Sequence, residues 1–223
     1  MKRVLLINPN SNPAVTQGME ETVAPLAHPG VAMDCVTMDE GPFGVETQEH
    51  TEMVTLPLRK RVAESDADAF VIACFSDPGL MVCREATRRP VLGIRECAVM
   101  SALMQGDRFG VVALGAASVR RHTPALRAMG VAQRCAGFGP LHLSVAAAEE
   151  PGAYPRVKTV AAELVERGAD TILLGCAGMA RHRAPLEDAL GVPVIDPVQA
   201  AAAHALGLVL LAGARMPMAA AAE

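Results

Sequence analysis

Residues 68–74, Asp-Ala-Phe-Val-Ile-Ala-Cys, return later in the chain as residues 170–176, Asp-Thr-Ile-Leu-Leu-Gly-Cys. Each segment begins with an aspartate, continues as an apolar run and ends in a cysteine. Two further pairs of segments repeat at nearly the same spacing: residues 2–7 with 107–112, and residues 90–93 with 193–196. This shared spacing predicts two lobes of the same topology, related by a pseudo-twofold axis.

Around these repeats, short runs of Val, Ile and Leu alternate with segments of helical period, which is typical of parallel α/β sheets. The predicted strands are residues 3–8, 32–37, 69–73, 91–93, 109–113, 171–174 and 192–195. The predicted helices are residues 13–25, 47–65, 79–88, 96–105, 119–129, 154–167, 185–190 and 198–212. The pattern therefore predicts the α/β class, with two pseudo-symmetric lobes, each a parallel sheet flanked by helices, and the active site in the cleft between them. We expect the lobes at residues 1–104 and 105–197, and a C-terminal helix in residues 198–223 that packs back on the first lobe.

The composition indicates a globular chain with a small-molecule partner. Its 223 residues are 51% hydrophobic and 20% charged, which is enough apolar material for a substantial core. The formal net charge of -4 includes no block of like charges, so we expect neither nucleic acid nor a membrane as a partner. The apolar stretches near the two ends are too short for a signal peptide or a membrane span, which favours a cytoplasmic location.

Two of the cysteines stand where chemistry is expected. Cys74 and Cys176 each end a predicted strand and precede a glycine-containing turn into a helix. Open parallel sheets bind ligands at this edge, and a helix amino terminus favours the thiolate form of a nearby cysteine. Two thiols that face each other across a cleft can racemise a carbon, because one removes a proton from one face while the other delivers a proton to the opposite face.

A packing role is the alternative, since a cysteine after an apolar strand is more often a small buried residue than a catalyst. The equivalent positions of Cys74 and Cys176 favour function. The four other cysteines have no such partner, and we interpret them as packing residues: Cys35, Cys83, Cys97 and Cys135.

Other motifs give no site. No Cys-x-x-Cys pair is present, which excludes a zinc knuckle and a dithiol redox motif. His50-Thr51-Glu52 resembles part of the zinc deaminase signature, but no Pro-Cys-x-x-Cys follows it. The sequence contains no G-x-G-x-x-G or Walker motif for nucleotides. We expect no metal and no cofactor, and we expect His182 to lie on a solvated basic surface.

Four segments resemble the Asp/Glu/hydantoin racemase superfamily, and its hydantoin and allantoin racemase branch in particular: residues 7–12, 73–80, 174–180 and 194–198. The resemblance spans nearly the whole chain. It implies two pseudo-symmetric lobes, no cofactor, an oligomeric assembly, and Cys74 with Cys176 as the paired acid/base residues. It also implies a substrate-binding set around these thiols: Asn8, Pro9, Asn10, Ser76, Asp77, Ala177 and Gly178.

Departures from the family pattern affect the substrate more than the chemistry. Hydantoin-type members tend to carry a Thr-Thr pair after the fifth strand, where this chain has residues 112–115, Val-Ala-Leu-Gly. The loop at residues 41–46 also differs, and within it Phe43 and Glu46 are the expected cleft residues. Two other functions stay open at this point. One is an arylmalonate-type decarboxylase with Cys176 as proton donor, which the presence of Cys74 disfavours, and the other is a non-catalytic binding protein.

Overall fold

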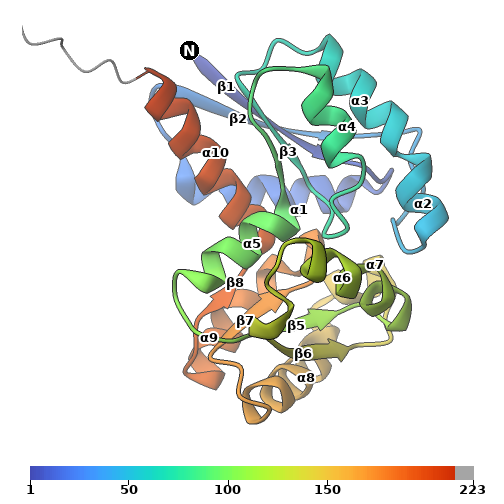
Figure 1. Cartoon of the computed structure of the whole chain (residues 1–223), viewed down its shortest axis with the longest axis vertical. Coiled ribbons are helices and arrows are strands. Elements are labelled where there is room, and N and C mark those ends of the chain that lie inside the picture. Colours follow the sequence, from blue (N-terminus) through green and yellow to red (C-terminus); the bar gives the residue numbers. More distant parts are fainter. Residues whose placement is uncertain (214–223) are drawn as a thin grey trace, which may run out of the picture.

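The computed structural model describes residues 1–213, which form two four-stranded parallel sheets flanked by helices (Figure 1). The first sheet has the strand order β2-β1-β3-β4, and the second has the order β6-β5-β7-β8. Each strand of the first sheet therefore has a counterpart at the same place in the second, β1 with β5 and β3 with β7. This repeated order confirms the predicted α/β class with two pseudo-symmetric lobes.

The strands are β1 (Lys2–Asn8), β2 (Val31–Thr37), β3 (Ala69–Ile72), β4 (Val91–Gly93), β5 (Phe109–Ala113), β6 (Cys135–Pro140), β7 (Thr171–Leu174) and β8 (Val194–Ile195). The α-helices are α1 (Pro13–Val23), α2 (Gln48–Met53), α3 (Thr55–Glu64), α4 (Leu80–Ala86), α5 (Ile94–Leu103), α6 (Ala116–Ala128), α7 (Val145–Glu149), α8 (Tyr154–Glu166), α9 (Arg183–Leu190) and α10 (Pro197–Gly213). Short 3-10 helices are η1 (Ala24–Leu26), η2 (Ala132–Arg134), η3 (Pro151–Ala153) and η4 (Ala177–His182).

Strand β1 shows why the strands read as nearly continuous apolar runs. Successive side chains of a strand point to opposite faces of the sheet. Val4 and Leu6 therefore join a core that continues into the second lobe, while Leu5 and Ile7 pack in a separate cluster on the other face. Both faces of the sheet are covered, which requires apolar residues at every position.

Two helices each follow a strand of one sheet and pack against the other sheet. Helix α5 follows β4 of the first sheet but contacts β5, β7 and β8 of the second. Helix α10 follows β8 of the second sheet but contacts β1, β3 and β4 of the first. The two helices also pack on each other, which joins the lobes (Figure 1).

The lobe boundaries at residues 104/105 and 197/198 stay a prediction, and residues 214–223 of the predicted last segment lie outside the described residues. Within residues 1–213, no helix combines the length and the apolarity that crossing a membrane requires.

One strand and one helix of the structure do not follow from the sequence pattern. Strand β6 contains two glycines and ends in Pro140, and both residue types are depleted in strands. Pro140 is tolerated because β6 is the edge strand of its sheet. Gly139 is required because a Cβ at this position would lie 2.2 Å from the Val160 side chain of α8. Helix α7 has only five residues, too few to show a helical period. The predicted helix at residues 47–65 is divided into α2 and α3.

Candidate active site

The two matched cysteines reach one cavity. Cys74 directly follows Ala73 at the end of β3, and Cys176 follows Gly175 at the end of β7, the equivalent strand of the other sheet. Both line a narrow cavity between the lobes, with a volume of about 30 Å³. Its other lining residues are Asn10, Val15, Val45, Ala73, Phe75, Ser76, Leu114, Ser118, Arg121, His122, Val145, Gly175 and Ala177. The topology thus brings together two thiols that stand far apart in the sequence.

Burial governs the acidity of both thiols. It raises the pKa of Cys176 to about 12, and the hydrogen-bonding amide of Gly178 only partly opposes this. Burial also raises the pKa of Cys74, against hydrogen bonds from the Ser76 amide and hydroxyl. The expected lowering by helix amino termini is therefore outweighed, because a charge that is buried between the lobes loses its hydration. A turn at residues 75–79 also separates Cys74 from the first turn of α4.

The loop after β1 is held by its own asparagines. Asn8 is fully buried and donates from Nδ2 to Asn10 Oδ1 at 3.0 Å and to Thr16 Oγ1 at 3.1 Å. The Asn12 amide also donates to Asn10 Oδ1. The Asn10 carboxamide oxygen is therefore engaged, which orients its NH₂ group for other partners. Of the three predicted residues, Asn10 lines the cavity and Asn8 holds Asn10 in place. Pro9 does not line the cavity, and its carbonyl packs against Gly41.

Asp77 serves the fold beside the first thiol. Its carboxylate accepts hydrogen bonds from the backbone amides of Arg95 and Glu96 at 3.0 and 3.1 Å, which caps the amino terminus of α5. The Arg95 guanidinium lies 3.5 Å away. Burial raises the pKa of Asp77 to about 6, although Arg95 lowers it. Asp77 is thus a buried helix cap and does not line the cavity, whereas its neighbour Ser76 does.

The loop at residues 41–46 contributes differently from the prediction. Phe43 is 63% exposed and lies outside the cavity, whereas Val45 is buried and lines it. The physical reason is that the chain bends at Phe43 and Gly44, so two side chains that stand two residues apart do not point to the same side. Glu46 lies at the boundary itself, where its carboxylate accepts a hydrogen bond of 2.9 Å from the Val145 amide of the second lobe.

Helix α6 supplies cavity residues that the sequence motifs do not identify. Ser118, Arg121 and His122 all line the cavity. Arg121 donates to the Glu46 carbonyl at 2.6 Å and to Ser76 Oγ at 3.4 Å, both in the first lobe. The buried stripe of Ser118, His122 and Leu126, spaced four residues apart, is the signal that could have identified this face.

His122 is a neutral histidine. It is 2% exposed, and its ring meets the Phe75 ring edge-on with 5.1 Å between centroids. Burial, together with the cations Arg95 and Arg121, lowers its pKa to about 3. Its Nδ1 has no hydrogen-bond partner within the part of the chain that the structure describes. At neutral pH this ring therefore adds no charge to the cavity.

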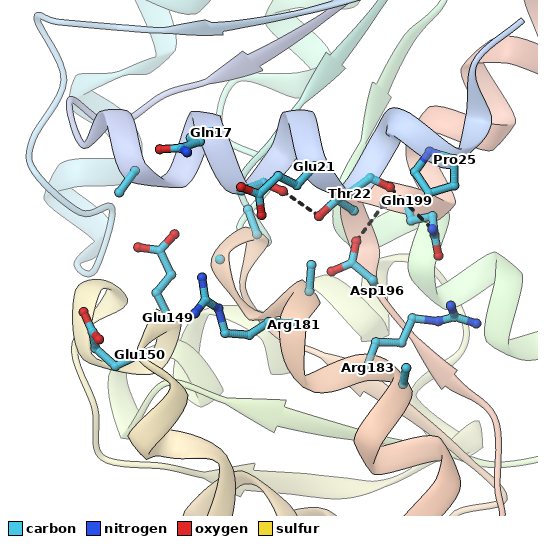
Figure 2. A pocket seen from close by; sticks show the side chains of 16 residues that line it. Gln17, Glu21, Thr22, Pro25, Glu149, Glu150, Arg181, Arg183, Asp196 and Gln199 are labelled. Carbon is cyan, nitrogen blue, oxygen red and sulfur yellow. Dashed lines mark hydrogen bonds between the residues drawn. The ribbon is translucent and has the colours of Figure 1, made fainter.

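A second, larger pocket lies beside η4, which begins directly after Cys176 (Figure 2). Its volume is about 520 Å³, and residues of α1, η4 and α9 line it. Gly178 lines this pocket rather than the cysteine cavity, and Ala177 lines both. Asp196 also lines it; burial raises the pKa of this carboxyl to about 7, although hydrogen bonds from the amides of Gln199 and Val198 lower it.

His182 corrects an expectation. It is buried rather than solvated, and Nε2 lies 3.0 Å from the Ala148 carbonyl of α7. Its ring stacks on Tyr154 with 6.1 Å between centroids. Among residues 1–213, no group of three or more His, Cys, Asp or Glu side chains is arranged to hold a metal ion.

The sequence profile of the Asp/Glu/hydantoin racemase family matches residues 4–205. The chain belongs to this family. It is 38% identical to a hydantoin racemase of Paenarthrobacter aurescens over 217 residues, which cover 94% of this chain and 92% of that protein. The resemblance stated from the sequence motifs is thereby confirmed.

Solved structures of the family agree with the fold. Allantoin racemase from Klebsiella pneumoniae superposes with a TM-score of 0.90 at 32% identity, over 95% of this chain and 89% of that one. Allantoin racemase from Pseudomonas fluorescens superposes with a TM-score of 0.89 at 30% identity, over 94% of this chain and 92% of that one. The two-lobed architecture is thus shared with both racemases.

Proposed function

We propose that this family member is a cofactor-independent racemase of a hydantoin, allantoin or a related amino-acid derivative, with Cys74 and Cys176 as its two acid/base residues. The observation that carries the proposal is that equivalent strands of the two sheets deliver the two thiols to one cavity. The names of the relatives support this choice of substrate class.

The proposed reaction transfers two protons. The Cys74 thiolate takes the proton from the stereocentre, and the electron pair moves onto the neighbouring carbonyl oxygen. The Cys176 thiol then delivers its proton to the opposite face of the carbon, which leaves Cys74 as thiol and Cys176 as thiolate. The reverse direction exchanges these roles, as paired acid/base catalysis requires.

Polar groups around the cavity are suited to the developing negative oxygen. Asn10 keeps its carboxamide oxygen on Asn8 and Asn12, so its NH₂ group can donate to a substrate oxygen. Ser76 and Ser118 add hydroxyls to the same lining. Donors held in place before the reaction stabilise such charge most effectively.

Substrate entry requires the cavity to open. Pockets for small organic molecules are usually about 300–1,000 Å³, whereas the cysteine cavity measures about 30 Å³. Bonds of Glu46 to Val145 and to Arg121, and of Arg121 to Ser76, cross from one lobe to the other at this cavity. We propose that these contacts break and re-form in each turnover.

The test is a screen of enantiopure 5-substituted hydantoins, allantoin and amino acids, followed as loss of optical rotation and corrected for enzyme-free racemisation. We expect racemisation of at least one hydantoin-type compound, unaffected by chelators or by added pyridoxal phosphate. Cys135→Ser, a half-buried thiol outside the cavity, is the matched control for the two cavity cysteines. Release of carbon dioxide from an arylmalonate without racemisation would favour the decarboxylase instead. Light scattering would measure the homo-oligomer that we also propose from the family likeness.

A further inference from the structure

The two thiols stand in unequal electrostatic surroundings. Burial raises the pKa of each, but the charges that follow differ. Near Cys74, Asp77 raises the thiol pKa, and the Arg121 cation lowers it by a smaller amount. Near Cys176, Cys74 itself, Glu149 and Asp196 all raise the thiol pKa.

The opposing acid beside Cys74 is largely compensated. Asp77 lies 3.5 Å from the Arg95 guanidinium and accepts two amide bonds from the start of α5. Arg121, in contrast, has no carboxylate within ion-pair distance in the part of the chain that the structure describes, although the Glu46 carboxylate raises its pKa from farther away. Its bonds go to uncharged oxygens, the Glu46 carbonyl and the Ser76 and Ser118 hydroxyls. Its positive charge is therefore available to the cavity.

We propose that Arg121 is a positioning residue that makes Cys74, rather than Cys176, the thiol that carries the negative charge when one of the pair ionises before substrate binds. Cys74 is then the resting base, and Cys176 is the resting acid. This assignment rests on the proposed function and deepens it. The geometry that carries it is the reach of Arg121 from α6 of the second lobe to Ser76 of the first, two residues beyond Cys74, along the wall of the same cavity.

Activity alone cannot separate the two thiols. The equilibrium constant of a racemisation is one, so kcat/KM must be equal for the two enantiomers whatever the charges in the free enzyme. Coupled titrations also blur the assignment when both thiols are present. The thiols must therefore be titrated singly and without substrate, Cys74 in the Cys176→Ser protein and Cys176 in the Cys74→Ser protein.

The experiment measures iodoacetamide alkylation of each thiol against pH by peptide mass spectrometry. The thiolate is the reactive form, so the midpoint of the profile reports the thiol pKa independently of access. We expect a lower midpoint for Cys74 than for Cys176. Arg121→Met should slow Cys74 labelling about tenfold at a given pH, the effect of one pKa unit, and leave Cys176 nearly unchanged. Arg121→Lys should restore most of the rate.

Arg120→Met is the matched control, because Arg120 is the exposed neighbour with the same charge. The assignment is overturned if the midpoint of Cys176 lies at or below that of Cys74. It is also overturned if Arg121→Met shifts the Cys74 profile no more than Arg120→Met does. The comparison of the two single-cysteine proteins decides it even if Arg121→Met does not fold. A protein that labels as expected but racemises nothing refutes the proposed function, whereas a racemase with the reverse labelling order refutes only this assignment.

Discussion

The carboxylate of Glu46 in the first lobe accepts a hydrogen bond of 2.9 Å from the backbone amide of Val145 in the second. The carbonyl of the same Glu46 accepts a second bond, of 2.6 Å, from Arg121 of the second lobe. Val145 and Arg121 both line the cysteine cavity. A single first-lobe residue is thus held twice by the opposite lobe, at the edge of the cavity.

Glu46→Ala is expected to weaken closure of the lobes. It removes a hydrogen bond with a charged acceptor, so we expect a loss of about 1–2 kcal/mol in the free energy of unfolding. We also expect a several-fold rise in KM for the racemised substrate. Urea unfolding and initial rates measure the two effects. Glu40→Ala, at an exposed position of the preceding turn, is the control, and an equal effect of both variants would contradict the role of Glu46.

Cys74→Ser and Cys176→Ser are expected to lose racemase activity by on the order of 10²–10⁴-fold, as is usual when an acid/base group is removed. In deuterated water, each variant should still exchange the proton of one enantiomer, and the two variants should prefer opposite enantiomers. Proton NMR of each enantiopure substrate measures this exchange. Racemisation at the wild-type rate by both variants would show that the matched cysteines only pack.

Asp196→Asn is expected to stabilise the protein more at high pH than at low pH. Burial raises the folded pKa of Asp196 from 3.8 to about 7, so between these values the folded state holds a proton that the unfolded state has lost. Stability contributed by the protonated carboxyl is therefore lost as pH rises through about 7. Asparagine does not ionise and escapes this loss.

The difference in unfolding free energy between Asp196→Asn and the wild type should grow by on the order of 1–3 kcal/mol from pH 5 to pH 8.5. Thermal unfolding at the two pH values measures it, and Asp188→Asn, at an exposed position of α9, is the control. A difference that is constant with pH would mean that Asp196 is not a buried, protonated acid.

Gly175→Ala is expected to damage the second lobe next to Cys176. A Cβ at Gly175 would lie 2.4 Å from the Val112 carbonyl oxygen, which is backbone and cannot move aside easily. We expect a destabilisation of about 1–3 kcal/mol, as for overpacked cores. Gly207→Ala in α10 meets nothing within 4 Å and should stabilise by about 0.5–1 kcal/mol. Urea midpoints compare the two variants, and stabilisation by both would contradict this packing.

The strand and helix pattern, the duplication and the two matched cysteines could be predicted from the sequence, because each depends on local order. Apolar runs specify buried strands, and two strands with the same ending in repeated units must reach equivalent places. Strand β6 could not be predicted this way, since Gly137, Gly139 and Pro140 are residue types that are depleted in strands. The close packing of α8 on Gly139, which only the tertiary structure shows, explains why glycine is present there.

Only the tertiary structure decided which side chains surround the thiols and how acidic the thiols are. Arg121 and His122 line the cavity from a helix of the lobe opposite to that of Cys74, whereas Phe43 lies outside the cavity. These positions depend on how the two lobes pack against each other. Burial between the lobes raises the pKa of each thiol, although the sequence pattern predicts helix ends that lower it. Local sequence determines the order of strands and helices, whereas hydration and charge depend on contacts between residues far apart in the chain.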